Sequence, residues 1–124
     1  MPTKRVLDVG NCQPDHTTLV RYLTGNFDVR VTRAHLADEA LEAMRAQPYD
    51  LVLINRKLDA NYSDGMDIIR QMKADPALDK VPVMLITNFA EHQQTAVSEG
   101  AELGFGKLEY DLSETRERLA TFLT

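Results

Sequence analysis

Short apolar runs alternate along the chain with longer segments in which apolar residues recur every three or four positions. The runs cover residues 6–9, 29–31, 51–54, 81–86 and 103–105. After each run the spacing becomes helical, as in the stripe of Leu19, Val20 and Leu23. The pattern therefore predicts five strands, each followed by a helix.

Residues that favour helix ends flank several of these segments. Gly25 follows the first stripe and is expected to cap the carboxyl end of that helix. Pro48 is expected to end the second helix. Asp111 is a candidate amino-terminal cap for the last helix, with Glu114 at the capping-box position.

Five strand–helix units predict an α/β fold with right-handed crossovers, a parallel sheet and helices on both of its faces. Residues 51–54 and 81–86 are apolar throughout, as expected of strands buried on both faces. Residues 28–33 alternate and residues 103–106 are short and glycine-rich, which is typical of edge strands. The strand order 2-1-3-4-5 fits, giving a flavodoxin-like (βα)5 three-layer sandwich. In such a sheet, ligands bind at the carboxyl ends of strands one and three.

Length, net charge and cysteine content exclude some classes of function but do not identify one. With 124 residues the chain is expected to form one domain over residues 1–124. The net charge, 14 − 19 = −5, argues against nucleic acid or an anionic membrane as the main partner. The beginning of the sequence has no apolar signal-peptide core, so a cytoplasmic location is expected. Cys12 is the only cysteine, which excludes an internal disulfide and a cysteine-based zinc cluster.

Four motifs surround the predicted strand ends, and together they carry a resemblance to a known family. They are YDLVLIN at 49–55, DGMDIIRQMK at 64–73, PVMLIT at 82–87 and EGAELGFGK at 99–107. With this spacing, the whole chain resembles the receiver domain of bacterial two-component response regulators.

The resemblance implies a phosphoryl-transfer site, which this sequence keeps only in part. In family members, a phosphoryl group is transferred to an aspartate of the domain itself, at the end of strand three. An acidic pair after strand one holds the required Mg²⁺. A hydroxyl after strand four and a lysine after strand five contact the phosphoryl group, and these fall on Thr87 and Lys107. The acceptor position falls on Asn55, and the acidic pair falls on Gly10 and Asn11.

Two further family positions also differ. The aromatic switch residue falls on Gly104, and Leu108 stands where a proline should follow the lysine. A family-like pocket would carry a net charge of about −2, which attracts Mg²⁺. In this chain the acceptor position, the two acidic-pair positions and the lysine position together carry one lysine and no acid, which gives a net charge of +1. We therefore expect an atypical receiver, or pseudo-receiver, that is not an enzyme and has no metal site, no Mg²⁺ and no other cofactor.

Two aspartates are candidate surrogate acids. Asp8 lies within the first, central strand, where an unpaired carboxylate would be costly. It is either part of a remodelled pocket or a structural partner, with Arg30, Thr32 or Lys107 as candidates. Asp59 lies in the loop after strand three, which is longer than in the family. It either reaches the pocket or is a solvated loop carboxylate.

Five other polar residues are candidates for a role, and two of them, Cys12 and Lys107, have two interpretations each. Cys12 precedes the first helix, where a thiol is either redox-active or inert. His16, His35 and His92 show no metal-ligand spacing and are expected on the surface. Lys107 is expected to hydrogen-bond Asn55 or backbone carbonyls, with an anion site shared with Thr87 as the alternative.

The leading hypothesis is a phosphorylation-independent protein-interaction module in bacterial signalling. By the resemblance, its partners are signalling proteins, or a second copy in a homodimer, meeting the face of segments 90–99, 103–105 and 112–123. The thin apolar content of 90–99 indicates a loosely held helix on that face. The alternatives are a working phosphorelay receiver that uses Asp8 or Asp59, and a flavodoxin-like domain that binds a small ligand such as FMN.

Overall fold

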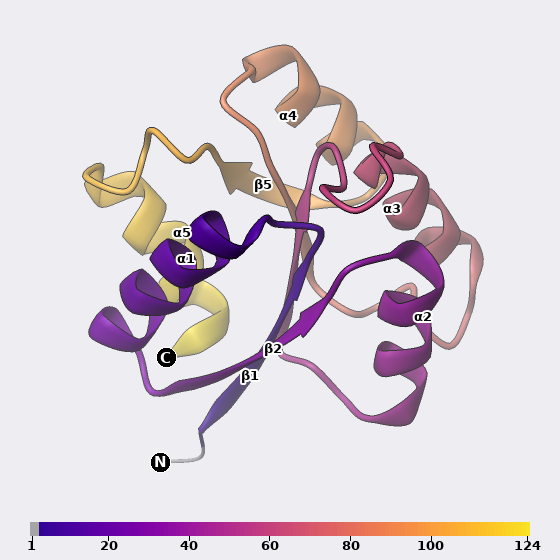
Figure 1. Cartoon of the computed structure of the whole chain (residues 1–124), viewed down its shortest axis with the longest axis horizontal. Coiled ribbons are helices and arrows are strands. Elements are labelled where there is room, and N and C mark those ends of the chain that lie inside the picture. The colour runs from indigo at the N-terminus through magenta and orange to yellow at the C-terminus, as the bar shows by residue number, and fades with distance from the viewer. Residues whose placement is uncertain (1–2) are drawn as a thin grey trace.

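A computed structural model describes residues 3–124 as a five-stranded parallel sheet covered by helices on both faces (Figure 1). The strand order is β2-β1-β3-β4-β5, which confirms the predicted flavodoxin-like topology. In chain order, the elements are β1 (Lys4–Val9), α1 (Gln13–Asn26), β2 (Val29–Ala34), α2 (Ala37–Ala46), β3 (Leu51–Asn55), α3 (Gly65–Ala74), β4 (Val83–Ile86), α4 (Ala90–Ser98), β5 (Glu102–Phe105) and α5 (Ser113–Leu123).

Two apolar cores lie on opposite faces of the sheet. Helices α1 and α5 pack on one face, where Leu19 and Leu119 contact a core that includes Leu53. Helices α2, α3 and α4 cover the other face, with a core that includes Ile54 and Ile69. Because successive strand residues point to opposite faces, an apolar run without polar breaks is what a doubly covered strand requires.

Several helix ends differ from the sequence predictions. Gly25 lies inside α1, which ends one residue later at Asn26. The Asn26 side-chain amide donates to the Tyr22 carbonyl (2.8 Å) in the last turn. Asp111 does not cap α5. That helix begins after Leu112 without a side-chain cap, and Glu114 accepts a hydrogen bond from the Ser113 hydroxyl instead.

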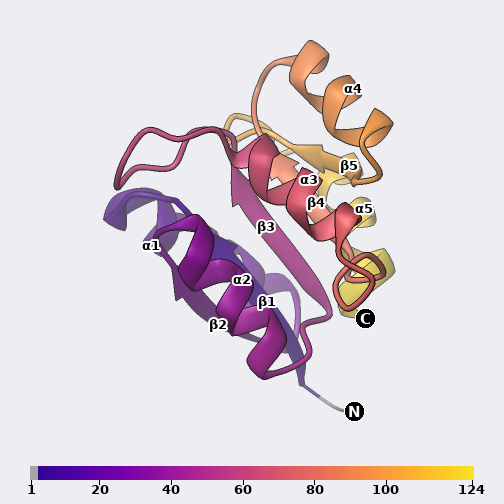
Figure 2. The same cartoon turned by 90° about the vertical axis from the view of Figure 1, so that its right-hand side faces the viewer.

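The carboxyl ends of β1, β3 and β4 lie side by side because the strands are parallel neighbours. Figure 2 shows the β3–α3 loop projecting beyond this edge of the sheet. Asp64 caps α3 at the far end of that loop by accepting a hydrogen bond from the Met66 amide (2.9 Å). Within residues 3–124, no helix has the length and apolar content needed to cross a bilayer.

Two glycines provide a matched test of this packing. A methyl group added at Gly65 would collide with the Asn55 carbonyl oxygen and lie 2.8 Å from the Ile54 side chain. Gly25 has no neighbouring atom within 4 Å of such a methyl group. We expect Gly65→Ala to lower the free energy of unfolding by about 1–3 kcal/mol. Gly25→Ala should raise it by about 0.5–1 kcal/mol, because alanine favours helix more than glycine does. Urea denaturation followed by circular dichroism measures the free energy of unfolding of both variants. Changes of the same sign would contradict the close contact between Gly65 and the end of β3.

Candidate functional site

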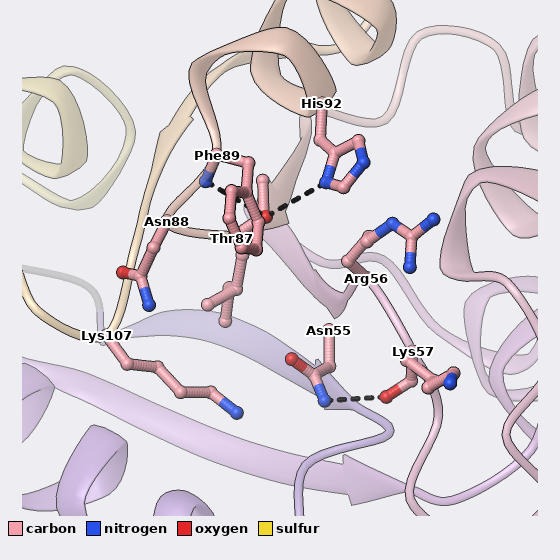
Figure 3. Close-up of a pocket in the computed structure, with 9 residues that line it drawn as sticks. Asn55, Arg56, Lys57, Thr87, Asn88, Phe89, His92 and Lys107 are labelled. Atoms are coloured by element: carbon pink, nitrogen blue, oxygen red, sulfur yellow. Dashed lines mark hydrogen bonds between the residues drawn. The ribbon is translucent and has the colours of Figure 1, made fainter.

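A cavity of about 260 Å³ lies at the carboxyl ends of β3, β4 and β5 (Figure 3). It brings together Asn55, Thr87 and Lys107, the three family positions that sequence reasoning placed near each other. Its lining residues are Asn55, Arg56, Lys57, Ile86, Thr87, Asn88, Phe89, His92 and Lys107. None of these nine residues is acidic.

Asn55 acts in this site as a hydrogen-bond donor. Its side-chain amide donates to the Lys57 carbonyl (2.7 Å) and, at 3.4 Å, to the Gly10 carbonyl. Both contacts use N–H groups, which a carboxylate lacks. The amide therefore ties the start of the β3–α3 loop to the end of β1.

The two positions that correspond to the acidic pair carry no acid into the cavity. Gly10 adopts a positive φ of 81°, and the Leu58 side chain occupies the space beside its α-carbon. Asn11 is almost fully buried and donates its side-chain amide to Asp8 Oδ1 (2.5 Å). Neither residue lines the cavity of Figure 3.

An acid that sequence reasoning missed neutralises Lys107. Lys107 Nζ lies 2.6 Å from Asp15 Oδ2, in the first turn of α1. This hydrogen bond is the main reason why the pKa of Asp15 lies below its usual value; partial burial opposes it and a hydrogen bond from Cys12 adds to it. The expected bond from Lys107 to Asn55 was wrong, since the ammonium group turns to this carboxylate. Asp15 was missed because the sequence prediction considered the charged residues at the ends of strands, whereas Asp15 lies in the first turn of a helix.

Asp8 is fully buried and has two hydrogen-bond partners. Asn11 contacts one of its carboxylate oxygens, and His16 Nδ1 lies 2.5 Å from the other. Because side chains alternate along β1, Asp8 points to the same face as Val6, the face covered by α1 and α5. The contact therefore fastens the start of α1 to the central sheet.

The partners proposed for Asp8 from sequence, Arg30, Thr32 and Lys107, were wrong. The predicted surface position of His16 was also wrong, because its side chain is only 18% exposed. A helix face is set by tertiary packing, and the stripe of α1 did not reveal that His16 points toward β1. His35 does lie on the surface, beside Glu39 on α2.

The negative charges of Asp8 and Asp15 also influence the pKa of Tyr110. Burial is the main cause of the raised pKa of Tyr110, and the two carboxylates raise it further. The phenol ring packs beside Phe105 and Tyr22. Tyr110 therefore stays neutral.

A buried glutamine occupies the region where the family has its aromatic switch. Gln93 on α4 donates its side-chain amide to the carbonyls of Leu85 (2.9 Å) and Thr87 (3.3 Å), and accepts from the Gly104 amide (2.9 Å). A methyl group at Gly104 would collide with the Leu85 carbonyl and lie 3.3 Å from Gln93 Oε1. The expectation of a loosely held helix overlooked this contact, because a polar residue on a polar helix gave no sign of burial.

Thr87 and His92 border the cavity from above in Figure 3. The Thr87 hydroxyl accepts a hydrogen bond from the Phe89 amide (3.3 Å) and lies 3.4 Å from His92 Nδ1. Although His92 was expected only on the surface, its ring is partly buried and lines the site. The Thr87 hydroxyl thus faces the same cavity as Asn55.

The remaining candidates lie beside this cavity. Asp59 is exposed and shares a smaller cavity of about 170 Å³ with Cys12, Asp15 and Asn55. The Cys12 side chain is partly exposed. Across residues 3–124, no three histidine, cysteine or acidic side chains are grouped as a metal ion would require.

The contact between Asp8 and His16 can be tested by substitution. His16→Ala leaves a fully buried carboxylate without one of its two partners, so we expect the free energy of unfolding to fall by about 3 kcal/mol. His35→Ala is the control, since its pair with Glu39 is half exposed and should contribute less than about 0.5 kcal/mol. Chemical denaturation measures both variants. A loss for His16→Ala no larger than that of the control would show that Asp8 does not depend on this contact.

The pair of Asp15 and Lys107 predicts a pH dependence. The pKa of Asp15 is lower in the folded than in the unfolded chain, so the pair stabilises the fold above about pH 4. This stability disappears as the pH falls through the lowered pKa. We expect Asp15→Asn to cost less than about 1 kcal/mol at neutral pH, since the pair is partly exposed, and to flatten the acid side of the stability profile. In a Lys107→Met background, the effect of Asp15→Asn should be much smaller, with only the contact from Cys12 left to lose; an undiminished effect there would rule out the pair.

Comparisons with known proteins agree with this geometry. Among solved structures, a Chloroflexus aurantiacus protein taken to be a response regulator has a TM-score of 0.83 at 18% identity, covering 98% of both chains. The signal receiver domain of a DNA-binding response regulator from Colwellia psychrerythraea has a TM-score of 0.80 at 19% identity, covering 95% of this chain and 96% of that one. The chemotaxis response regulator CheY4 of Vibrio cholerae has a TM-score of 0.74 at 16% identity, covering 97% and 98%.

At these identities the structural likeness shows the fold, and the family comes from sequence. No curated protein sequence matches the chain. The family model of the response regulator receiver domain matches residues 13–108, which is most of the chain. The chain therefore belongs to the response regulator receiver domain family.

Proposed function

We propose that this receiver domain works in bacterial signal transduction as a phosphorylation-independent protein-interaction module. The observation that carries the proposal is the donor role of Asn55, whose side-chain N–H groups bind two backbone carbonyls at the acceptor position. An amide is not a usable nucleophile for phosphoryl transfer. The nearest acid to the retained lysine, Asp15, is already paired with it.

Contacts among the domain's own residues support the same conclusion. In the family that the sequence resembles, a threonine hydroxyl and an aromatic ring move together on phosphorylation. Here the ring position is Gly104, and Gln93 hydrogen-bonds the backbone around it. These bonds hold α4 against β4 and β5 without a phosphoryl group, which favours a domain with one constant conformation.

The proposed partners are signalling proteins that bind the face of α4, β5 and α5. Val97 on α4 and Leu103 on β5 expose 44% and 47% of their surfaces there, so this face offers apolar area to a protein. A homodimer through the same face is the alternative. The proposal includes a cytoplasmic location, no enzymatic activity, no Mg²⁺ or other cofactor, and no binding to nucleic acid or membrane.

A phosphorelay receiver with a surrogate acid is the second candidate. Asp59 fits this role better than Asp8, because it is exposed and borders the smaller cavity beside Asn55. Asp8 has no exposed surface, and both of its oxygens accept hydrogen bonds.

Phosphoryl transfer can be tested directly. We expect the intact mass of the protein to stay unchanged after incubation with acetyl phosphate and Mg²⁺, because the acceptor and both Mg²⁺-binding acids are missing. A receiver domain with the full set of acids is the positive control for the donor. A gain of one phosphoryl group that Asp59→Asn abolishes would replace the proposal with the phosphorelay alternative.

A further inference from the structure

We infer that the face of α4, β5 and α5 binds a basic segment of a partner protein, in which lysine or arginine side chains surround an apolar one. A second copy of this chain does not fit the same face. Figure 1 shows β5 between α4 and α5, so side chains of all three elements meet at this edge of the sheet. The inference rests on the proposed function, which gives this face protein partners, and adds the chemistry of the partner.

A groove of about 250 Å³ lies between the two helices, beside β5. Gln94 on α4, Leu103 and Gly104 on β5, and Arg118 on α5 contribute to its lining. Gly104 has no side chain to fill the groove. Leu103, together with Val97 on α4, is nearly half exposed. The centre of the face therefore offers apolar area and a hollow for a side chain of the partner.

Acidic side chains border this groove on all three elements. Glu91 lies one helical turn before Gln94, and Glu114 lies one turn before Arg118, so each shares a helix face with a residue that lines the groove. Glu102 is exposed on β5 itself. Within residues 3–124, none of these three carboxylates forms a salt bridge. Their charges are therefore available to a partner.

Positive charge on this face is small by comparison. Of the two arginines on α5, Arg116 lies over the Phe27 ring, and Arg118 lines the groove. The Arg118 guanidinium donates a hydrogen bond to the Gly104 carbonyl (2.8 Å). Glu109 also lines the groove and adds a fourth acid. Four acids and one arginine thus surround the apolar centre, which makes the face complementary to a basic partner.

The same charges disfavour a dimer of this chain through this face. In a two-fold symmetric interface a patch meets its own copy, so the acids of one protomer would lie against those of the other. Arg118 alone is too few to pair with them, and unpaired like charges across an interface cost free energy. A partner that carries lysine or arginine opposite these acids removes the repulsion and still covers Val97 and Leu103.

The inference is tested by titrating ¹⁵N-labelled protein with two short peptides that differ only in charge. One has lysines flanking a pair of leucines, and the other has glutamates in place of the lysines. We expect the lysine peptide to cause saturable amide shifts at Gln94, Val97 and Gly104, and the glutamate peptide to cause none. Glu102→Lys should weaken binding of the lysine peptide about fivefold, because an attractive charge becomes a repulsive one. The matched control is Glu42→Lys, which reverses an exposed acid on α2 and should leave the affinity unchanged, since α2 packs against β2 at the opposite edge of the sheet from β5.

Three results of the titrations would overturn the inference: no saturable shifts on this face, equal binding of the two peptides, or equal losses in Glu102→Lys and Glu42→Lys. Sedimentation velocity of the protein alone should show a monomer. A dimer that Leu103→Ser abolishes would place a second copy on the face and also overturn the inference, while the proposed function would stand. A gain in intact mass with acetyl phosphate contradicts the proposed function instead, and the peptide titrations do not depend on phosphoryl transfer.

Discussion

The buried carboxylate of Asp8 sets the arrangement of the whole site. A charge in the middle of a doubly covered sheet must be satisfied, and here Asn11 and His16 satisfy it from the β1–α1 loop and the first turns of α1. This contact holds the start of α1 against β1, and the first turn of α1 places Asp15 beside Lys107. The helix that contacts the buried acid therefore also carries the acid that pairs with Lys107.

The polar side chains of the site bind other groups of the same chain. Asn55 binds backbone carbonyls from its side-chain amide, and Asp15 takes up the charge of Lys107. Gln93 bonds the backbone beside Gly104, so α4 is held by the sheet itself. These contacts account for how a receiver fold could keep its shape without a metal ion or a phosphoryl group.

The sequence was sufficient to predict the fold, because apolar runs and helical stripes report burial directly. The strand order followed from the contrast between continuous runs such as 51–54 and the alternating edge at 28–33. The polar contacts were not predictable in the same way. Asp15, His16 and Gln93 lie on helices, and only packing decides which face of a helix turns inward. Gly25 failed as a helix-end signal, since α1 continues to Asn26, whose side-chain amide donates to the Tyr22 carbonyl in the last turn.

We propose that the site keeps one conformation, held by its own residues. Amide spectra of the ¹⁵N-labelled protein, recorded in phosphate-free buffer before and after addition of Mg²⁺ and the phosphoryl-group mimic beryllofluoride, test it most directly. We expect no Mg²⁺-dependent shift of the signals of Gln93 and Gly104. A concerted shift of these signals, dependent on Mg²⁺, would contradict it and show that the switch still operates.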